Sequence, residues 1–388
     1  MRTFAVLGIL ATLGASALLV KPSPGRNEPA DSPPPAAQVS GEWFTYHGGY
    51  ALDGVADQAP PDKPELLWRY KAGARVHSTP LVADGRVYTA HAKGGVAALG
   101  PDGQPVWTAQ LGKEPFKAPM LYLAKTLVMG NEAGTLFALD ADTGKEKWTY
   151  AVGDTIQGSA NRVELPGGKA GVVVLSQSDG SLHCVDLETG KLQWKTPEFE
   201  RCDGSPSSLA GRVVLGSCAS ALHVYDTAKP GKPADVDLGG DSQVAGGVAL
   251  SGVQAFAGTR GGKLVAADVA AGKILWTLAE SKKEAFATPA VGPNLVVFAN
   301  DDGKVYGVDR STGKALWSAD TGGSPGSPVI AGNRVVVASS GTLLIFDLLK
   351  GDKIWSAEVS DDATPPAVAG GVIYVGADDG TVSAWGKK

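Results

Sequence analysis

The feature that most constrains this chain is a tryptophan that recurs about every 40 residues. The gap between Trp194 and Trp276 is 82 residues, which is two periods with Val236 at the missing position. Strand-rich repeats of this length are typical of β-propeller blades. The recurring residues are Trp68, Trp107, Trp148, Trp194, Trp276, Trp317 and Trp355.

Each period repeats the same strand and turn signals. A Ser/Thr-Pro motif, as at residues 78–80, precedes a β-branched run, and an Asp-Gly turn follows, as at residues 301–303. Asp-Gly between apolar runs favours a tight hairpin, because such a turn needs φ > 0. An alternating strand and a short outer strand with the tryptophan complete the period. The pattern predicts four antiparallel strands per blade.

The repeats add up to a closed ring. The last repeat has no outer strand after it, but residues 65–70 (ELLWRY) carry an extra one before the first repeat. We expect these segments to pair, because an open ring would leave unpaired edges. The sequence therefore predicts an all-β, eight-bladed β-propeller closed by an N-terminal strand in the last blade. Its second strands begin near Arg86, Thr126, Gly171, Arg212, Gly252, Leu295, Arg334 and Gly371.

The residues before the ring predict export. Arg2, an apolar run over residues 4–14 and Ala15-Ser16-Ala17 form a secretory signal over residues 1–20. The apolar run reaches Val20, so an uncleaved anchor in the inner membrane is the alternative. Residues 21–42 form a proline-rich disordered linker, and residues 43–388 form a single propeller domain. We place the protein in the periplasm or cell envelope.

Five repeats share the frame D-x-x-x-G-x-x-x-W. Aspartate caps the turn, glycine takes the left-handed position, and the indole packs on the neighbouring blade, with its N–H bonded to a carbonyl. We therefore interpret the seven recurring tryptophans as structural residues that dock the blades.

The repeat A-x-D-x-x-T-G-x-x-x-W resembles that of the pyrroloquinoline-quinone (PQQ) propeller family. This family includes alcohol and glucose dehydrogenases and the non-catalytic BamB subunit of the outer-membrane assembly machinery. For a dehydrogenase the resemblance implies a calcium ion, a catalytic aspartate and usually adjacent cysteines at the quinone. The sequence has no Cys-Cys pair.

We therefore predict a non-catalytic, BamB-like scaffold of the cell envelope, with no catalytic residues, cofactor or metal. The alternatives are a redox quinoprotein with PQQ and calcium, and an extracellular glycan binder. The partners are expected to be proteins, and the chain to be a monomer. The net charge of −5, without a basic stripe, argues against nucleic acid. Membrane contact would come only through an uncleaved N-terminal anchor.

Polar residues at the starts of the first strands are expected to face the central funnel, which is the default place for a small ligand. The alternative is that they are simply solvated. These residues are Arg75, His77, Lys117, Gln157, Asp203 and Gln243.

Two cysteines flank a predicted hairpin. A turn at residues 210–211 would place Cys202 and Cys218 opposite each other, at a separation that suits a disulfide in an exported protein. Cys184 is expected to pack as a small apolar residue.

Overall fold

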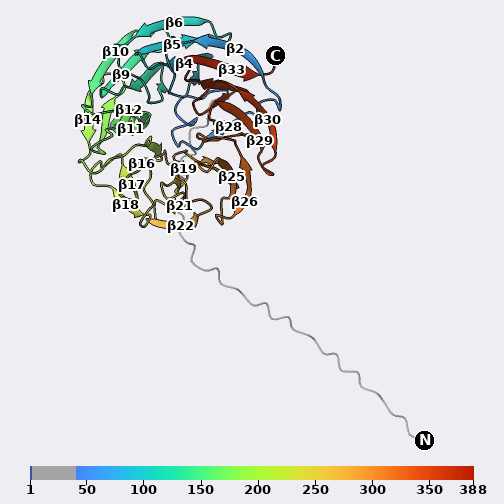
Figure 1. Ribbon diagram of the computed structural model, residues 1–388. Helices are drawn as coiled ribbons and strands as arrows, with labels where there is room; N and C mark the ends of the chain where they lie inside the picture. The colour runs from blue at the N-terminus through green and yellow to red at the C-terminus, as the bar shows by residue number, and fades with distance from the viewer. Residues whose placement is uncertain (2–40) are drawn as a thin grey trace. The chain divides into compact units, whose positions relative to one another are not determined.

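The computed structural model describes Met1 and residues 41–388 (Figure 1). Eight antiparallel sheets surround a central axis, so the predicted eight-bladed propeller is confirmed. The predicted signal and nearly all of the linker lie outside the described residues. Over the part of the chain that is described, no helix has the length and apolar character needed to cross a membrane.

In each blade the fourth strand lies at the circumference of the ring (Figure 1). Blades 1 and 2 are β3 (Leu81–Ala83), β4 (Arg86–Ala90), β5 (Gly95–Leu99) and β6 (Pro105–Gln110), then β7 (Leu121–Leu123), β8 (Thr126–Gly130), β9 (Thr135–Asp140) and β10 (Glu146–Ala151). Blades 3 and 4 are β11 (Asn161–Leu165), the 3₁₀ turn η1 (Pro166–Gly168), β12 (Lys169–Leu175), β13 (Leu182–Asp186) and β14 (Leu192–Lys195), then β15 (Ser207–Leu209), β16 (Arg212–Gly216), β17 (Ala221–Asp226) and β18 (Ala234–Asp237).

The second half of the ring repeats this order. Blades 5 and 6 are β19 (Ala249–Ser251), β20 (Gln254–Gly258), β21 (Leu264–Asp268) and β22 (Lys273–Leu278), then β23 (Ala290–Val291), β24 (Leu295–Asn300), β25 (Lys304–Asp309) and β26 (Ala315–Asp320). Blades 7 and 8 are β27 (Val329–Ala331), β28 (Arg334–Ser339), β29 (Thr342–Asp347) and β30 (Lys353–Glu358), then β31 (Ala367–Ala369), β32 (Val372–Gly376), β33 (Thr381–Gly386) and β2 (Glu65–Lys71).

The ring closes as predicted. Strand β2 pairs antiparallel with β33, with Trp68 opposite Ala384 and Lys71 opposite Thr381. The last blade therefore combines three strands from the C-terminus with one from the N-terminal part of the chain.

The tryptophans dock successive blades. Trp317 donates its indole N–H to the carbonyl of Leu348 in the next blade at 3.0 Å. Gly351, with φ of 74°, lies against the same indole, and a Cβ there would come within 2.6 Å of the ring. The glycine of one repeat therefore makes room for the tryptophan of the preceding one. The same indole-to-carbonyl bond is made by Trp68, Trp107, Trp148 and Trp276.

Two tryptophans depart from this pattern. The indole N–H of Trp194 is buried and has no hydrogen-bond partner. Trp355 instead packs edge-on against Trp385, at 5.7 Å between ring centroids. Neither of the blades that follow them carries the regular D-x-x-x-G turn that would receive the indole.

The residues just before β2 cross the axis of the ring, a role that the sequence did not reveal. We call residues 41–60 the axial segment. Trp43 exchanges two backbone hydrogen bonds with Val82, and β1 (Val55–Ala56) pairs parallel with β27. Between Trp43 and β1, backbone carbonyls of the axial segment accept hydrogen bonds from the first strands of blades 2, 4, 5, 6 and 7. The donors are the amides of Tyr122, Ser208, Leu250, Val291 and Ile330.

Candidate functional site

A funnel lies on the axis at the end opposite the turns that join first and second strands. One cavity of about 210 Å³ is lined by His77, Gln157, Asp203 and Phe286, and by Tyr46 from the axial segment. A second cavity of about 330 Å³ shares Tyr46, Phe286 and Pro365 with it. Together the two cavities draw residues from all eight blades.

The axial segment forms the floor of the funnel. The Tyr46 hydroxyl lies 3.0 Å from Thr288 Oγ1 and 2.8 Å from Ser327 Oγ, which fixes the ring between blades 6 and 7. The next residue, His47, places Nδ1 2.7 Å from the Leu52 carbonyl and Nε2 2.8 Å from the Pro328 carbonyl. Burial raises the pKa of Tyr46 and lowers that of His47. These two side chains hold the floor in place.

The structure brings together three of the six residues predicted for the funnel. His77, Gln157 and Asp203 line the same cavity, although the structure does not test their role in ligand binding. The other three do not line either cavity: Arg75 lies 3.8 Å from Asp378, Lys117 pairs with Glu132 at 2.5 Å, and Gln243 is exposed.

Asp203 is the centre of a charged network on the rim. Its Oδ1 accepts hydrogen bonds from Gln177 Nε2 at 2.7 Å and Arg201 Nε at 2.8 Å. Arg260 Nη2 lies 3.6 Å from its Oδ2. Such exposed pairs add little stability, but charged groups at a rim favour a complementary partner.

Arg260 extends the network to an exposed aromatic. Its Nη1 lies 3.4 Å from Glu284 Oε1, and its guanidinium carbon lies 5.1 Å from the centre of the Phe286 ring. Phe286 is 39% exposed. Arginine and aromatic side chains are enriched at the centres of protein–protein interfaces. Arg260, Glu284 and Phe286 are not predictable from the sequence, because no motif marks them.

The floor did leave a signal in the sequence. Residues 43–50 read WFTYHGGY, a density of aromatics that is unusual directly after a proline-rich segment. Such a run needs a buried place, and in this fold the axis provides it: Trp43 is fully buried.

Burial, and then the positive charges of Arg75 and Lys117, lower the pKa of His77.

The predicted funnel carboxylate, Asp203, is a poor ligand for the calcium ion of a PQQ site. Calcium needs several free oxygen ligands, whereas the Asp203 carboxylate is already engaged by two guanidinium groups and an amide. Among residues 41–388, no group of three or more His, Cys, Asp or Glu side chains could hold a metal ion. That the protein works without a cofactor stays a prediction.

The predicted disulfide is not confirmed. All three cysteines are free thiols, so the structure contains no bond between Cys202 and Cys218. In the hairpin between them Leu209 pairs with Arg212, so its centre lies half a residue beyond the expected one. The Cys218 amide instead donates to the Arg201 carbonyl at 3.2 Å. Cys184 is fully buried in an apolar cluster, as expected.

A comparison with known families matches most of the chain. The family described as "Outer membrane protein assembly factor BamB" matches residues 61–229 and 178–388. Curated relatives carry the same description. One from Burkholderia pseudomallei is 29% identical over 308 residues, covering 74% of this chain and 77% of the relative. Another from Xanthomonas campestris is 29% identical over 287 residues, covering 67% and 69%.

Solved structures agree on the fold. BamB from Moraxella catarrhalis is 21% identical, with a TM-score of 0.72, over 84% of this chain and 98% of that one. Quinohemoprotein alcohol dehydrogenase from Comamonas testosteroni is 16% identical, with a TM-score of 0.73, over 91% and 82%. Identities this low establish the shared propeller and nothing about chemistry.

Proposed function

Because this chain belongs to the outer membrane protein assembly factor BamB family, we propose that it is a non-catalytic scaffold that serves the assembly of outer membrane proteins. The family match over the whole ring, from residue 61 to residue 388, carries this proposal. A scaffold needs no catalytic constellation, only a surface that a partner recognises.

The open end of the funnel is the surface we assign to the protein partner. There Arg260 stacks on the half-exposed Phe286 and pairs with Glu284. An aromatic anchor beside an arginine, within a charged rim, has the composition of an interface centre. Toward the opposite end the axial segment joins the blades across the axis, and its carbonyls there already accept hydrogen bonds from the first strands.

The scaffold would work as a monomer in the periplasm. Residues 1–20 would direct export, and the proline-rich residues 21–42 would space the ring from whatever holds the N-terminus. The quinoprotein alternative has less support, since the funnel carboxylate Asp203 is engaged by Arg201 and Arg260.

Gene deletion followed by complementation tests the proposal. Deletion should lower the amounts of outer membrane proteins, and the wild-type chain should restore them. Unchanged amounts after deletion would contradict the assembly role itself.

Variants at the two ends of the ring then test the surface. In the deletion strain, Arg260→Glu and Phe286→Ala at the funnel should restore the amounts of outer membrane proteins less well than the wild-type chain. Lys350→Glu and Leu349→Ala, in the β29–β30 turn at the other end, are matched controls, and Leu349 is 73% exposed. If all four variants complement equally, the partner does not bind at the funnel.

A further inference from the structure

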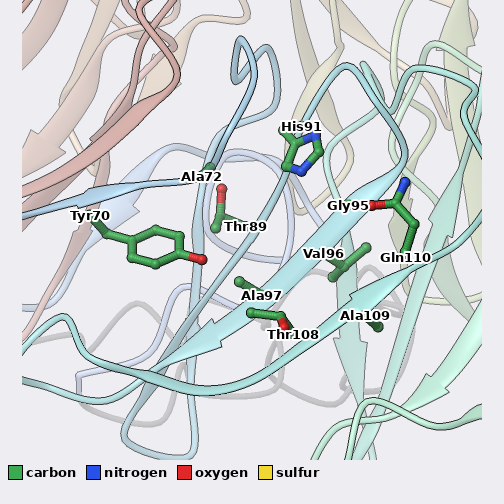
Figure 2. A pocket seen from close by; sticks show the side chains of 10 residues that line it. All are labelled: Tyr70, Ala72, Thr89, His91, Gly95, Val96, Ala97, Thr108, Ala109 and Gln110. Atoms are coloured by element: carbon green, nitrogen blue, oxygen red, sulfur yellow. The ribbon is translucent and has the colours of Figure 1, made fainter.

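A cavity of about 390 Å³ lies between the last blade and the first (Figure 2). Tyr70 and Ala72, on and just after β2, form one wall. Thr89, Ala97 and Thr108 of blade 1 form the other. Its volume lies within the ~300–1,000 Å³ typical of small-molecule sites. Tyr70 and Thr108 lie on β2 and β6, the outermost strands of their blades, and none of the residues that line the cavity lines the funnel.

The cavity exists because one row of side chains in blade 1 is small. Thr89 pairs with Ala97, and Ala97 with Thr108, across β4, β5 and β6. Six of the other blades have a distinctly larger residue at the place of Ala97, and blade 8 has Ser383 there. The corresponding rows are Met129–Phe137–Thr149, Val174–His183–Lys195, Leu215–His223–Asp235, Ala257–Val265–Thr277, Phe298–Tyr306–Ser318, Val337–Leu344–Ser356 and Val375–Ser383–Arg69.

Blade 3 shows one way in which this space is filled. The hydroxyl of Tyr150, the counterpart of Tyr70, lies 2.9 Å from the Nδ1 atom of His183 across the blade boundary. At the first blade the counterpart of His183 is Ala97, whose methyl group leaves the space open. In Figure 2 the Tyr70 hydroxyl is directed toward the Thr89–Ala97–Thr108 row.

One residue of the lining, Thr89, has a polar group without a partner. Thr89 is 1% exposed, and its hydroxyl has no hydrogen-bond partner. Leaving a buried hydroxyl unpaired is costly. Every counterpart of Thr89 in the other rows is apolar, so the fold does not require a hydroxyl here. A bound molecule that hydrogen-bonds Thr89 would explain why this blade has one.

The other polar groups of the cavity are neutral donors and acceptors. Gln110 Nε2 donates hydrogen bonds to the carbonyls of Lys93 and Gly112, at 2.5 and 2.6 Å. Its Oε1 is left as an acceptor, on the side facing His91 in Figure 2. His91 Nδ1 accepts from the Lys93 amide at 3.1 Å, so Nε2 carries the proton. Burial, and then the charge of Lys93, lower the pKa of His91.

We propose that this cavity binds one ring of an uncharged sugar. No Asp, Glu, Lys or Arg lines it, so nothing there would neutralise a charged ligand. Three hydroxyls, an amide oxygen and an imidazole N–H match the mixed donors and acceptors of a polyol. The Tyr70 ring provides an apolar wall for the carbon face of a sugar. The proposal is independent of the assembly role.

Titration with free sugars tests the site. We expect N-acetylglucosamine or glucose to bind the purified chain with a Kd of ~1 mM or tighter, followed by calorimetry and ligand-observed NMR. Glucosamine and glucuronate, which carry a charge on a similar ring, should bind at least about tenfold more weakly. Failure of both neutral sugars to bind, or equal binding of the charged ones, would overturn the proposal.

Three variants locate the binding. Ala97→His places in blade 1 the residue that fills the same position in blades 3 and 4, and it should abolish binding while the chain stays folded. Thr89→Val should weaken binding about tenfold and yet keep or raise the melting temperature. Thr79→Val is the matched control, because Thr79 is also buried with an unpaired hydroxyl but lines the funnel. Retained binding in Ala97→His, or a loss in Thr79→Val, would overturn the assignment.

Discussion

The indole N–H of Trp68 donates a hydrogen bond of 2.9 Å to the carbonyl oxygen of Pro101, and the two residues belong to the last and the first blade. Gly103 lies under the same indole, as Gly351 lies under Trp317. The junction that closes the ring thus uses the same contacts as the junctions within it. A chain segment from before the first repeat does the work of a repeat tryptophan.

Truncating that tryptophan should therefore cost as much as truncating one inside the ring. Trp68→Ala and Trp317→Ala should each lose on the order of 3–5 kcal/mol, because both indoles pack between blades and bond a carbonyl. Thermal melting of both variants checks this. A Trp68→Ala variant that melts like wild type would show that the junction contributes nothing.

Glycines in the docking turns provide a second comparison. Gly351 and Gly272 occupy the same turn position, with φ of 74° and 65°. Gly351 contacts Trp317, whereas Gly272 has nothing within 4 Å of a Cβ, since Val236 replaces the tryptophan of the preceding blade. Alanine strains the backbone at both positions.

We therefore expect Gly351→Ala to lower the melting temperature clearly more than Gly272→Ala. The difference between the two losses in melting temperature measures the clash of the added methyl group with the Trp317 indole. Equal losses would mean that backbone strain alone accounts for the requirement for glycine.

The axial segment should contribute stability that β2 does not. Deleting residues 1–40 should leave the melting temperature unchanged. Deleting residues 1–60, which keeps β2, should lower it, because the hydrogen bonds to blades 1, 2, 4, 5, 6 and 7 are lost along with buried Trp43. If the two truncations melt alike, the floor of the funnel is dispensable for stability.

Asp53 makes the axial segment sensitive to pH. Burial raises the pKa of its carboxyl to about 6, and its Oδ1 is buried without a partner. The protonated form therefore favours the folded state: this stabilisation is complete below about pH 4 and is lost as the pH rises through about 6.

Asp53→Asn, which stays neutral, should raise stability at pH 8 by on the order of 1–2 kcal/mol and leave it nearly unchanged at pH 4. Melting curves at both pH values measure the difference. A gain of the same size at both would exclude titration of Asp53 as the cause.

Much of the fold could be predicted from the sequence, because the repeat itself encodes it. The aspartate, glycine and tryptophan of each period act through local turns and through contact with the next blade, so spacing alone reveals them. The spacing identifies Trp68 in this way, although it lies far from the last blade in sequence.

The sites were less predictable, because they arise where the repeat is broken. Phe286 and Arg260 meet from two blades without a shared motif. Tyr46 reaches the axis from outside the repeats, and the small Ala97 matters only beside Tyr70. The disulfide between Cys202 and Cys218 stays a prediction, since the structure shows both as free thiols.

Site-specific photo-crosslinking tests the central claim most directly, namely that the open end of the funnel holds a protein partner. A photoreactive residue replaces Phe286 at the funnel or Leu349 at the opposite end, in cells that assemble outer membrane proteins. The account predicts that position 286 crosslinks to a component of the outer membrane assembly machinery and that position 349 does not. Crosslinking at position 349 alone, or at neither position, would contradict it.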